Sequence, residues 1–315
     1  MSDKKIIEIG DLSGVGPVAE EKLRTAGYMS LMSVAVASIP ELAEVSGLTE
    51  KVCRKIAKEA RDAINLGFED ADDFEEKRSK ISRISTGLDE FDEMLGGGFE
   101  CGSITEFYGE WSGGKSQLCF LACASVQKND PNAKVIYLDT EGSFRGSRIR
   151  DFAEGFEIDP DKVLKNVKIA RIYSVDHQML MIDEIEKMIN DGENIRLIIV
   201  DSLTALFRVE YQARGTLANR QQKLNKHLHN LIKVADMYGI TVIVTNQVMA
   251  KPDSFYGDPT TAVGGHIVGH ASSTRIYLRK GAKGSRVAKL VDSPNLPDGE
   301  VNYVITKNKL VFFKK

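Results

Sequence analysis

One eight-residue stretch constrains the fold of this chain more than any other. Residues 104–108 predict a strand and residues 115–129 predict a helix, and between them the chain follows the pattern G-x-x-x-x-G-K-[ST]. In that context backbone N–H groups curl around phosphates, the lysine reaches the β- and γ-phosphates, and the hydroxyl binds Mg²⁺. We therefore predict a site for a nucleoside triphosphate and Mg²⁺. Its residues are Gly109, Glu110, Trp111, Ser112, Gly113, Gly114, Lys115 and Ser116.

Two carboxylates are candidates for the chemistry around that loop. Asp201 ends the apolar run 197–200, which is the Walker B pattern, and we expect it to help hold the metal ion. Glu141 follows the predicted strand 134–139 by two residues, at the edge of the sheet where ligands bind. Hydrolysis needs a group that orients or deprotonates water, and Glu141 fits that role. An isolated glutamate is also often a plain surface residue, so the pattern alone leaves both readings open.

From about residue 84 the pattern predicts an α/β core of the P-loop type with a mostly parallel central sheet. Apolar runs alternate with amphipathic stretches, which indicates helices packed on the faces of such a sheet. The last third, residues 274–313, has short β-rich runs and predicts an antiparallel extension. Predicted strands are 104–108, 134–139, 167–172, 196–201 and 241–245, and predicted helices are 115–129, 177–190 and 219–237.

The first sixty residues contain two similar halves. In each, a glycine-containing turn precedes a helical pattern: Gly14 and Gly16 come before residues 18–26, and Gly47 comes before residues 52–66 with Thr49 as the expected N-cap. A glycine hairpin between short helices presents backbone N–H groups to a phosphate, the helix-hairpin-helix mode of DNA contact. The pattern fits equally a small helical bundle whose glycines only turn the chain. We assign residues 1–64 to this domain.

An acidic segment separates the two regions. Six of the eight residues from 69 to 76 are carboxylates, a load that predicts a solvated linker, which we place at residues 65–83. Phe68 at its head is out of character there. It is either a plug against the helical bundle or an anchor offered to a partner.

Composition limits the class of protein. The chain has 42 basic and 45 acidic residues and a net charge of −3, which excludes a cationic coat, so nucleic-acid contacts must come from local patches. No stretch is long and apolar enough for a membrane span, and the first residues lack the apolar region of a signal peptide. The four cysteines form no Cys-x-x-Cys pair, which favours a reducing, cytoplasmic setting.

Two polar segments of the core are candidates for such patches. Residues 208–226 carry five basic side chains against one acidic one, with interleaved glutamine and asparagine, which suits a loop that grips phosphates. Residues 248–273 are glycine-rich with little apolar content, and they are long for a loop without a purpose. Their composition also fits a solvated face with a lid.

Several longer motifs resemble those of the RadA recombinases, the archaeal members of the RecA-type strand-exchange family. The likeness extends over nearly the whole chain, and it includes the N-terminal hairpins and the linker. It rests on Asp139-Thr140-Glu141-Gly142-Ser143-Phe144-Arg145, Arg220-Gln221-Gln222-Lys223-Leu224, Asn246-Gln247-Val248-Met249-Ala250, Gly264-Gly265-His266-Ile267, Thr274-Arg275-Ile276-Tyr277-Leu278-Arg279-Lys280-Gly281, Asp292-Ser293-Pro294 and the 207–215 segment.

The resemblance implies a DNA-dependent ATPase that uses ATP and Mg²⁺. It implies a catalytic role for Glu141 with Lys115, and roles as sensors of nucleotide state for Gln247 and His270. Arg148 would lie against the adenine, and residues 292–297, with Asp292 and Pro297 at their ends, would cap ATP from the neighbouring subunit. The implied DNA-contacting residues of the core are Arg208, Tyr211, Arg214, Arg220 and Pro252.

The resemblance also implies partners: single- and double-stranded DNA, further copies of the chain in a filament or ring, and recombination mediators. Phe68 and Ala71 match the Phe-x-x-Ala hook that docks on an adjacent core. Three departures stand out. The P-loop reads Glu-Trp-Ser-Gly-Gly where the family usually has Glu-Phe-Gly-Ser-Gly, and Gly146-Ser147-Arg148 replaces the usual Pro-Glu-Arg. The connection 129–133 is shorter than the family's glycine- and proline-rich insertion. A P-loop helicase or autokinase, and a non-catalytic mediator, remain as alternatives.

Overall fold

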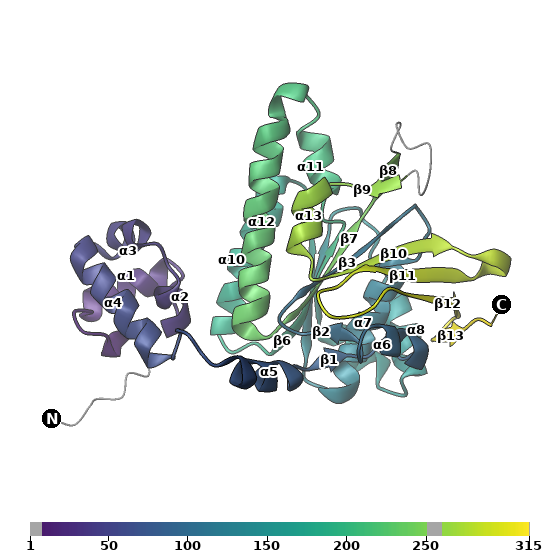
Figure 1. Ribbon diagram of the computed structural model, residues 1–315, viewed down its shortest axis with the longest axis horizontal. Coiled ribbons are helices and arrows are strands. Elements are labelled where there is room, and N and C mark those ends of the chain that lie inside the picture. Colours follow the sequence, from purple (N-terminus) through teal and green to yellow (C-terminus); the bar gives the residue numbers. More distant parts are fainter. Residues whose placement is uncertain (1–7, 251–259, 315) are drawn as a thin grey trace. The chain divides into compact units, whose positions relative to one another are not determined.

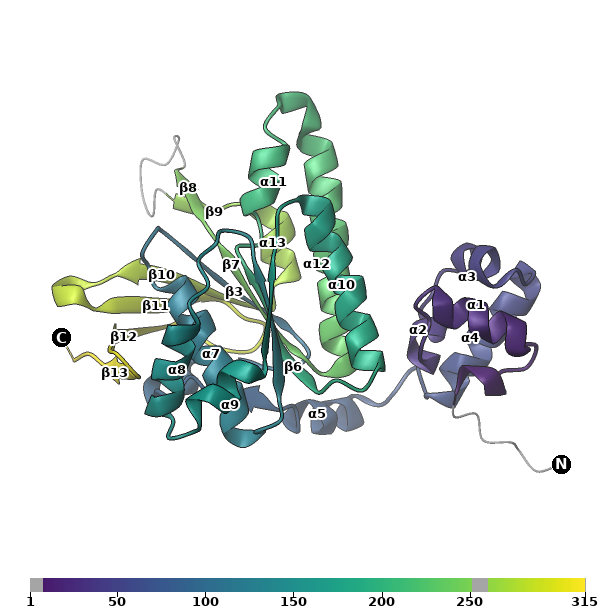
Figure 2. The ribbon, with the colours of Figure 1, turned by 180° about the vertical axis from the view of Figure 1, so that it is seen from behind.

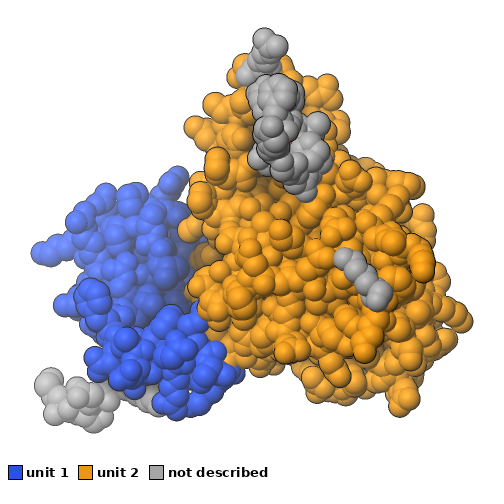
Figure 3. All heavy atoms as spheres, turned by 45° about the vertical axis from the view of Figure 1, so that its right-hand side comes forward, with its two compact units in different colours: residues 1–80 blue, residues 81–315 orange. Residues whose placement is uncertain are grey.

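The computed structural model describes residues 8–250 and 260–314 and divides the chain into two compact units, Met1–Lys80 and Ile81–Lys315 (Figure 3). The first unit is helical (Figure 1). Its elements are η1 (Ile9–Asp11), α1 (Pro17–Thr25), α2 (Leu31–Ala35), α3 (Ile39–Ser46), α4 (Glu50–Ala63) and α5 (Ala71–Ser79).

The predicted helical repeats are present in the first unit. α1 and α4 correspond to the predicted stretches 18–26 and 52–66. Gly47, at φ +72°, ends α3 in the left-handed conformation that glycine adopts without strain, and the Thr49 hydroxyl accepts the N–H of Val52 at 3.4 Å to cap α4. The core between these helices is apolar, with Leu23 and Ile56 fully buried.

The acidic segment contains secondary structure, since residues 71–79 form the helix α5. None of its residues is buried, so the segment is solvated as expected. Asp72 and Asp73 lie in its first turn and Lys77 and Arg78 in its last, an order that favours a helix through its dipole. Phe68 is fully exposed, so it is not a plug against the helical bundle.

The second unit is built on a nine-stranded sheet (Figure 1). Its order is β13-β12-β11-β10-β3-β7-β6-β4-β5, in which the strands from β10 to β5 are parallel and β11 to β13 extend one side antiparallel. The predicted fold class is therefore confirmed. The strands are β3 (Ile104–Gly109), β4 (Lys134–Asp139), β5 (Val167–Arg171), β6 (Ile195–Asp201), β7 (Thr241–Asn246), β10 (Thr274–Lys280), β11 (Arg286–Asp292), β12 (Gly299–Ile305) and β13 (Leu310–Phe312).

Helices cover both faces of the sheet (Figures 1 and 2). Alternate residues of each central strand enter opposite cores: Ile199 packs with the α7 side, and Ile198 and Val200 pack with the α10 and α12 side. The helices of this unit are α6 (Asp89–Met94), α7 (Lys115–Asn129), α8 (Gly146–Gly155), α9 (Pro160–Lys165), α10 (Val175–Asn190), α11 (Ala205–Glu210), α12 (Leu217–Tyr238) and α13 (Gly265–Ala271). Shorter elements are β1 (Arg83–Ile84), β2 (Phe99–Glu100), β8 (Val248–Ala250), β9 (Thr260–Ala262), η2 (Arg214–Thr216) and η3 (Ala282–Gly284).

The two polar segments contain regular structure where a loop was predicted, and residues 219–226 lie in α12 as the predicted helix 219–237 required. Residues 208–226 belong mostly to α11 and α12, because their leucine, alanine, arginine, glutamine and lysine residues are good helix formers. Residues 248–273 contain the paired strands β8 and β9 and the helix α13. The tip of α11 and α12 and the β8–β9 pair project from the same end of the core (Figures 1 and 2).

None of the described helices combines the length and the apolar character that crossing a bilayer requires.

Candidate functional site

The phosphate loop connects β3 to α7 at the carboxyl edge of the sheet. Gly109 has φ +154°, and a Cβ there would lie 2.0 Å from the carbonyl oxygen of Leu278 in β10, so only glycine fits. Gly114, at φ +108°, directly precedes α7. Ser112 has φ +66°, a conformation that disfavours side chains, at the position where the motif usually has glycine. Trp111, which stands where the family usually has phenylalanine, is exposed.

The Lys115 side chain folds back over the phosphate loop. Its Nζ donates to the carbonyl oxygens of Gly109 at 2.8 Å and Glu110 at 2.9 Å. Burial lowers the pKa of Lys115, while the carboxylates of Asp201 and Glu141 act in the opposite direction. A partly desolvated ammonium flanked by phosphate-binding backbone is suited to bind an anion.

Asp201 ends β6 beside the loop and is almost completely buried. Its carboxylate accepts hydrogen bonds from the hydroxyls of Tyr137 at 2.6 Å, Ser143 at 3.1 Å and Thr245 at 2.5 Å. These three hydroxyls fix the carboxylate rotamer. No local sequence pattern marks these hydroxyls, because they belong to separate positions that only the folded sheet brings together with Asp201.

A second buried aspartate shapes the turn that carries Glu141. One Asp139 oxygen, Oδ1, accepts the backbone N–H groups of Glu141 at 3.2 Å, Gly142 at 2.7 Å and Ser143 at 3.1 Å. This arrangement folds the chain back after β4 and directs Glu141 outward. Asp139 had no predicted role, although an aspartate three residues before a glycine is a recognisable turn signal.

Glu141 meets two predicted site residues from other elements. Its Oε1 accepts a hydrogen bond from Nε2 of Gln247 at 2.8 Å, and Oε1 of Gln247 accepts one from Nη1 of Arg208 at 2.9 Å. The pKa of Glu141 is raised, first by desolvation and then by the Asp201 charge, and the hydrogen bond from Gln247 and the charge of Lys115 act against that rise. The structure thus joins a candidate catalytic carboxylate to a candidate DNA-contacting arginine through one amide.

A network of buried hydrogen bonds holds the backbone of Gln247. The Asn246 amide oxygen accepts the backbone N–H of Gln247 at 2.9 Å and the hydroxyl of Thr204 at 2.7 Å, and its Nδ2 donates to Glu106 at 2.8 Å. The other Glu106 oxygen accepts Nε of Arg275 at 2.7 Å. Glu106 and Asn246 are fully buried, and Glu106 in mid-strand gave no functional signal in the sequence.

Comparison with known proteins agrees with this geometry. Residues 77–311 match the Rad51 family model, and residues 6–62 match a model described as a SAM-like helix-hairpin-helix tandem. The chain belongs to the Rad51 family. A DNA repair and recombination protein RadA from Aeropyrum pernix is 44% identical over 308 residues, which cover 96% of each chain. The predicted resemblance to the RadA recombinases is confirmed.

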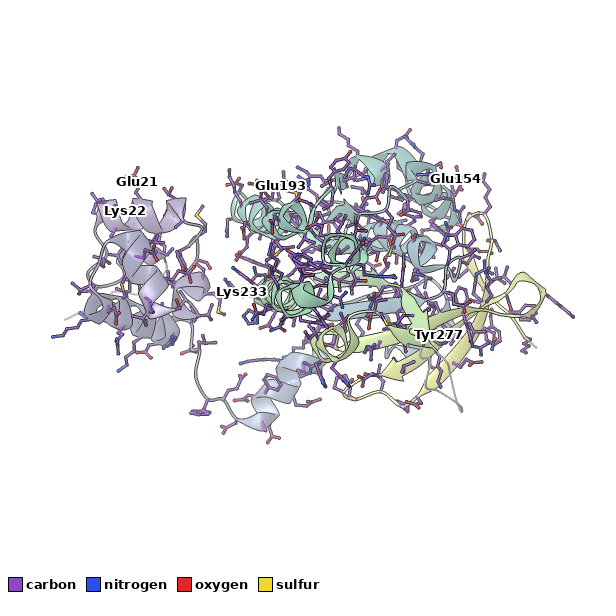
Figure 4. All side chains as sticks on the ribbon, turned by 90° about the horizontal axis from the view of Figure 1, so that it is seen from above. Glu21, Lys22, Glu154, Glu193, Lys233 and Tyr277 are labelled. Atoms are coloured by element: carbon purple, nitrogen blue, oxygen red, sulfur yellow. The ribbon has the colours of Figure 1, made fainter. Side chains whose placement is uncertain are left out.

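Within the Rad51-family core, the guanidinium group of Arg148 is held in place by several hydrogen bonds and an aromatic ring. Its Nε donates to Gln117 at 2.9 Å, Nη1 to Asp151 at 2.7 Å and to the Lys307 carbonyl at 2.5 Å, and its guanidinium lies 4.6 Å from the Phe152 ring centroid. The guanidinium therefore already lies against an aromatic ring, the kind of planar group on which arginine stacks. The β12–β13 turn approaches α8 closely, and a Cβ at Gly155 would lie 1.8 Å from the Asn308 carbonyl oxygen. Figure 4 labels the neighbouring Glu154, which lies 3.9 Å from Lys307 Nζ.

The predicted cap residues lie far from the phosphate loop of the same chain. In the register of the sheet, Asp292 of β11 lies beside Arg275 of β10, and Arg275 lies beside Glu106 of β3. Gly109 of the phosphate loop lies beside Leu278, nearer the other end of β10. After Asp292 the chain continues away from the loop, and Pro297 is exposed. The structure therefore does not bring Asp292 and Pro297 to the nucleotide site of their own chain.

The candidate DNA-binding residues occupy the projecting end of the core. Arg208 is exposed on α11, Tyr211 caps that helix beneath Lys223, whose Nζ lies 5.6 Å from the ring centroid, and Arg220 lies on α12. Arg214 begins η2 between the two helices.

The second polar segment is described in part. Pro252 falls outside the described residues. His270 is exposed on α13, with its ring centroid 5.9 Å from that of His266. A Cβ at the adjacent Gly269 would lie 3.2 Å from Nη1 of Arg275, which places α13 against the Glu106 network.

The N-terminal glycines occupy turn positions, as expected. Gly14 has φ +98° and Gly16 is the N-cap residue of α1. The backbone N–H of Ser13 donates to Oε2 of Glu59 at 2.7 Å, so a carboxylate of the same unit already accepts one amide of this turn.

Proposed function

We propose that this protein is an ATP-dependent homologous-recombination protein that forms filaments on single-stranded DNA and exchanges strands with homologous duplex. Members of the Rad51 family are DNA-dependent ATPases coupled to strand exchange, and this chain belongs to that family. The main structural support for the roles proposed below is the Arg208–Gln247–Glu141 bridge. It joins a candidate DNA contact to a candidate catalytic carboxylate.

We assign nucleotide binding to the phosphate loop. Lys115 neutralises the β- and γ-phosphates, and the backbone N–H groups of residues 109–116 surround them. Ser116 at the start of α7 and the oriented carboxylate of Asp201 would hold Mg²⁺, since hydroxyl and carboxylate oxygens, supplemented by water, are the ligands it prefers. When bound, the ion neutralises charge on the phosphates.

We assign the base to Glu141. The Asp139-stabilised turn holds it at the carboxyl edge of the sheet, where it orients a water molecule and accepts its proton. Its raised pKa brings its basicity closer to that suited to proton transfer near neutral pH. Gln247 and His270 lie on either side of the β8–β9 segment and contact the γ-phosphate, so its loss is transmitted to the DNA-binding end.

The base and the neighbouring subunit complete the nucleotide site. Arg148, with one face on Phe152, stacks on the adenine. Asp292 and Pro297 cap the nucleotide of an adjacent copy, which accords with their distance from the loop of their own chain. ATP at such an interface adds charge-assisted contacts between copies and favours the extended filament.

The linker supplies a second contact between copies. Phe68 is fully exposed in a segment without helix or strand, and Ala71 follows at the start of α5. β5 is one of the two outer strands of the sheet, and its Ile169 side chain is exposed. An edge strand offers unpaired backbone groups to an extended segment, and a large exposed aromatic side chain gains free energy on burial. The Phe68 segment thus docks on the β5 edge of the next copy.

DNA contacts are assigned to both units. In the core, Arg208, Tyr211, Arg214, Arg220 and Pro252 hold the strand by its backbone, which leaves base edges free for pairing. In the N-terminal unit, the turns at Gly14 and Gly16 contact phosphates. We assign residues 1–64 to this DNA-binding domain, 65–83 to the linker and 84–315 to the ATPase core. We also propose recombination mediators as partners and a cytoplasmic location, which the four free cysteines favour.

The direct test is filament assembly on single-stranded DNA by electron microscopy, with Lys115→Ala beside the wild type. We expect ATP-dependent filaments from the wild type and none from the variant, because loss of the ammonium leaves the phosphates without their main cation. Lys128→Ala is the matched control, since Lys128 is exposed at the other end of α7. Normal filaments from Lys115→Ala in ATP would contradict the proposal, and DNA translocation without pairing would identify a helicase.

A further inference from the structure

One amide connects the DNA-binding end of the core to Glu141. Arg208 donates to the Gln247 side-chain oxygen at 2.9 Å, and the nitrogen of the same amide donates to Glu141 at 2.8 Å. An arginine has donors only and a carboxylate accepts. The two neighbours therefore set which way the amide faces, and Arg208 keeps the Gln247 NH₂ group on the carboxylate.

The backbone that carries these groups is fixed by buried hydrogen bonds. Thr204, the residue before α11, donates its hydroxyl to Asn246 Oδ1 at 2.7 Å, and the Gln247 N–H donates to the same oxygen at 2.9 Å. The Leu203 N–H donates to the Thr245 carbonyl at 2.9 Å. The start of α11 and the backbone of Gln247 are thus held beside each other, and movement of the two side chains is enough to open the bridge.

The Arg208 end of the bridge is open to an anion. The arginine is exposed, and its acceptor in the bridge is a neutral amide oxygen. A phosphate accepts two parallel charge-assisted hydrogen bonds from a guanidinium, which are stronger than one bond to an amide. A DNA phosphate at this end of the core therefore competes with Gln247 for Arg208.

We propose that Arg208 is a positioning residue of the ATPase site, which holds the Gln247 amide on Glu141 without DNA and releases it when a DNA phosphate binds. A carboxylate oxygen that accepts a hydrogen bond from Gln247 is a weaker acceptor for the proton of water, so the bridge restrains hydrolysis until DNA opens it. The inference rests on the proposed function, since it takes Glu141 as the base and DNA as the anion.

The test is ATP hydrolysis without DNA, with kcat and KM measured separately for Arg208→Met and Arg208→Lys. Loss of one hydrogen bond to a charged group corresponds to roughly a tenfold change in an equilibrium, so we expect the DNA-free kcat of Arg208→Met to rise by up to about tenfold. The KM for ATP should change less than about twofold. Arg208→Lys keeps a cationic donor on a side chain of different geometry, so its DNA-free kcat should rise less than that of Arg208→Met. Arg150→Met, which removes an exposed arginine paired with Asp161, is the control.

A DNA-free kcat of Arg208→Met that equals or falls below the wild-type value would overturn the inference. Thermal unfolding of each variant verifies that it is folded, and Arg208→Gln repeats the measurement if the methionine variant is not. Failure of the proposed function is visible separately, because the wild type would then show no stimulation by single-stranded DNA. A wild type that DNA stimulates, beside an Arg208→Met variant with an unchanged DNA-free rate, overturns the inference alone.

Discussion

Two regions of the chain differ sharply in burial: the hydrogen-bond network around Glu106 is buried, whereas the segment around Phe68 is exposed. Glu106 is completely buried and binds Asn246 and Arg275 at 2.8 and 2.7 Å. Phe68 is fully exposed, and the adjoining helix α5 buries none of its residues. Under the proposed function, this difference separates the two roles: the candidate groups for chemistry are positioned inside one chain, whereas Phe68 would be buried by a partner.

The same contrast appears in the ion pairs of the two regions. Arg275 and Glu106 pair in the interior, where removal of one partner leaves the other charge without compensation. Lys77 and Glu69 pair on the exposed linker, where water and salt screen the charges. We therefore expect substitutions in the first region to unfold or distort the core, and those in the second to change assembly alone.

The largest expected effect on stability comes from Glu106→Ala. It leaves Arg275 unpaired and removes the acceptor of Asn246, which should lower the free energy of unfolding by about 3–5 kcal/mol. Chemical denaturation followed by circular dichroism measures the loss. Glu69→Ala, which breaks the exposed pair with Lys77, is the matched control and should leave the unfolding midpoint unchanged. Equal losses of stability from the two substitutions would contradict the claim that the buried ion pair matters more than the exposed one.

Phe68→Ala should weaken assembly and leave folding intact. Burial of a phenylalanine side chain contributes about 2–3 kcal/mol, so each contact between copies should weaken by roughly 30- to 150-fold. Analytical ultracentrifugation over a concentration series measures the shift toward smaller species. Phe74→Ala, which replaces the other exposed phenylalanine of the linker, is the control. If assembly by Phe68→Ala matched the wild type, the linker would not be the second contact.

The smallest effect is a pH dependence confined to the core. Burial lowers the pKa of His227, on α12 beside Gln178, from 6.5 to about 4. Between these values the unfolded chain binds a proton that the folded chain does not, so stability is full above pH 6.5 and falls as the pH drops toward 4. From pH 7 to pH 5 the loss should be about 2 kcal/mol. Residues 1–80 contain no histidine, so the N-terminal unit lacks this dependence.

Denaturation at several pH values compares the wild type with His227→Gln, which keeps a polar group there without the titration. The difference in unfolding free energy between the two proteins should change by about 2 kcal/mol from pH 7 to pH 5. Parallel losses in both proteins would show that His227 stays uncharged in the unfolded chain or is charged in the core.

Local patterns in the sequence predicted the fold well where one signal dominated. The Gly109–Ser116 motif sets both its flanking elements, and α7 has the predicted bounds 115–129. Prediction was wrong for residues 208–218, where a loop was expected and helix propensity favours α11 and the start of α12. The acidic run is solvated as predicted, but the helix α5 within it was not foreseen, although its charge order suits a helix dipole.

The site was predictable only in part for a different reason. Glu141 and Asp201 follow strands and are recognisable one at a time. The hydroxyls on Asp201, the Glu106–Asn246 contact and the Arg208–Gln247 bridge join residues 39 to 140 positions apart. Nothing local in the sequence marks such pairs, since they exist only after parallel strands place their carboxyl ends at one edge of the sheet.

The measurement that tests the central claim most directly is strand exchange between homologous single- and double-stranded DNA, with and without ATP. We expect exchange that requires both ATP and homology, and for Glu141→Gln we expect persistent filaments with turnover lowered by about 10²- to 10⁴-fold. ATP hydrolysis by the wild type without any exchange would contradict the account.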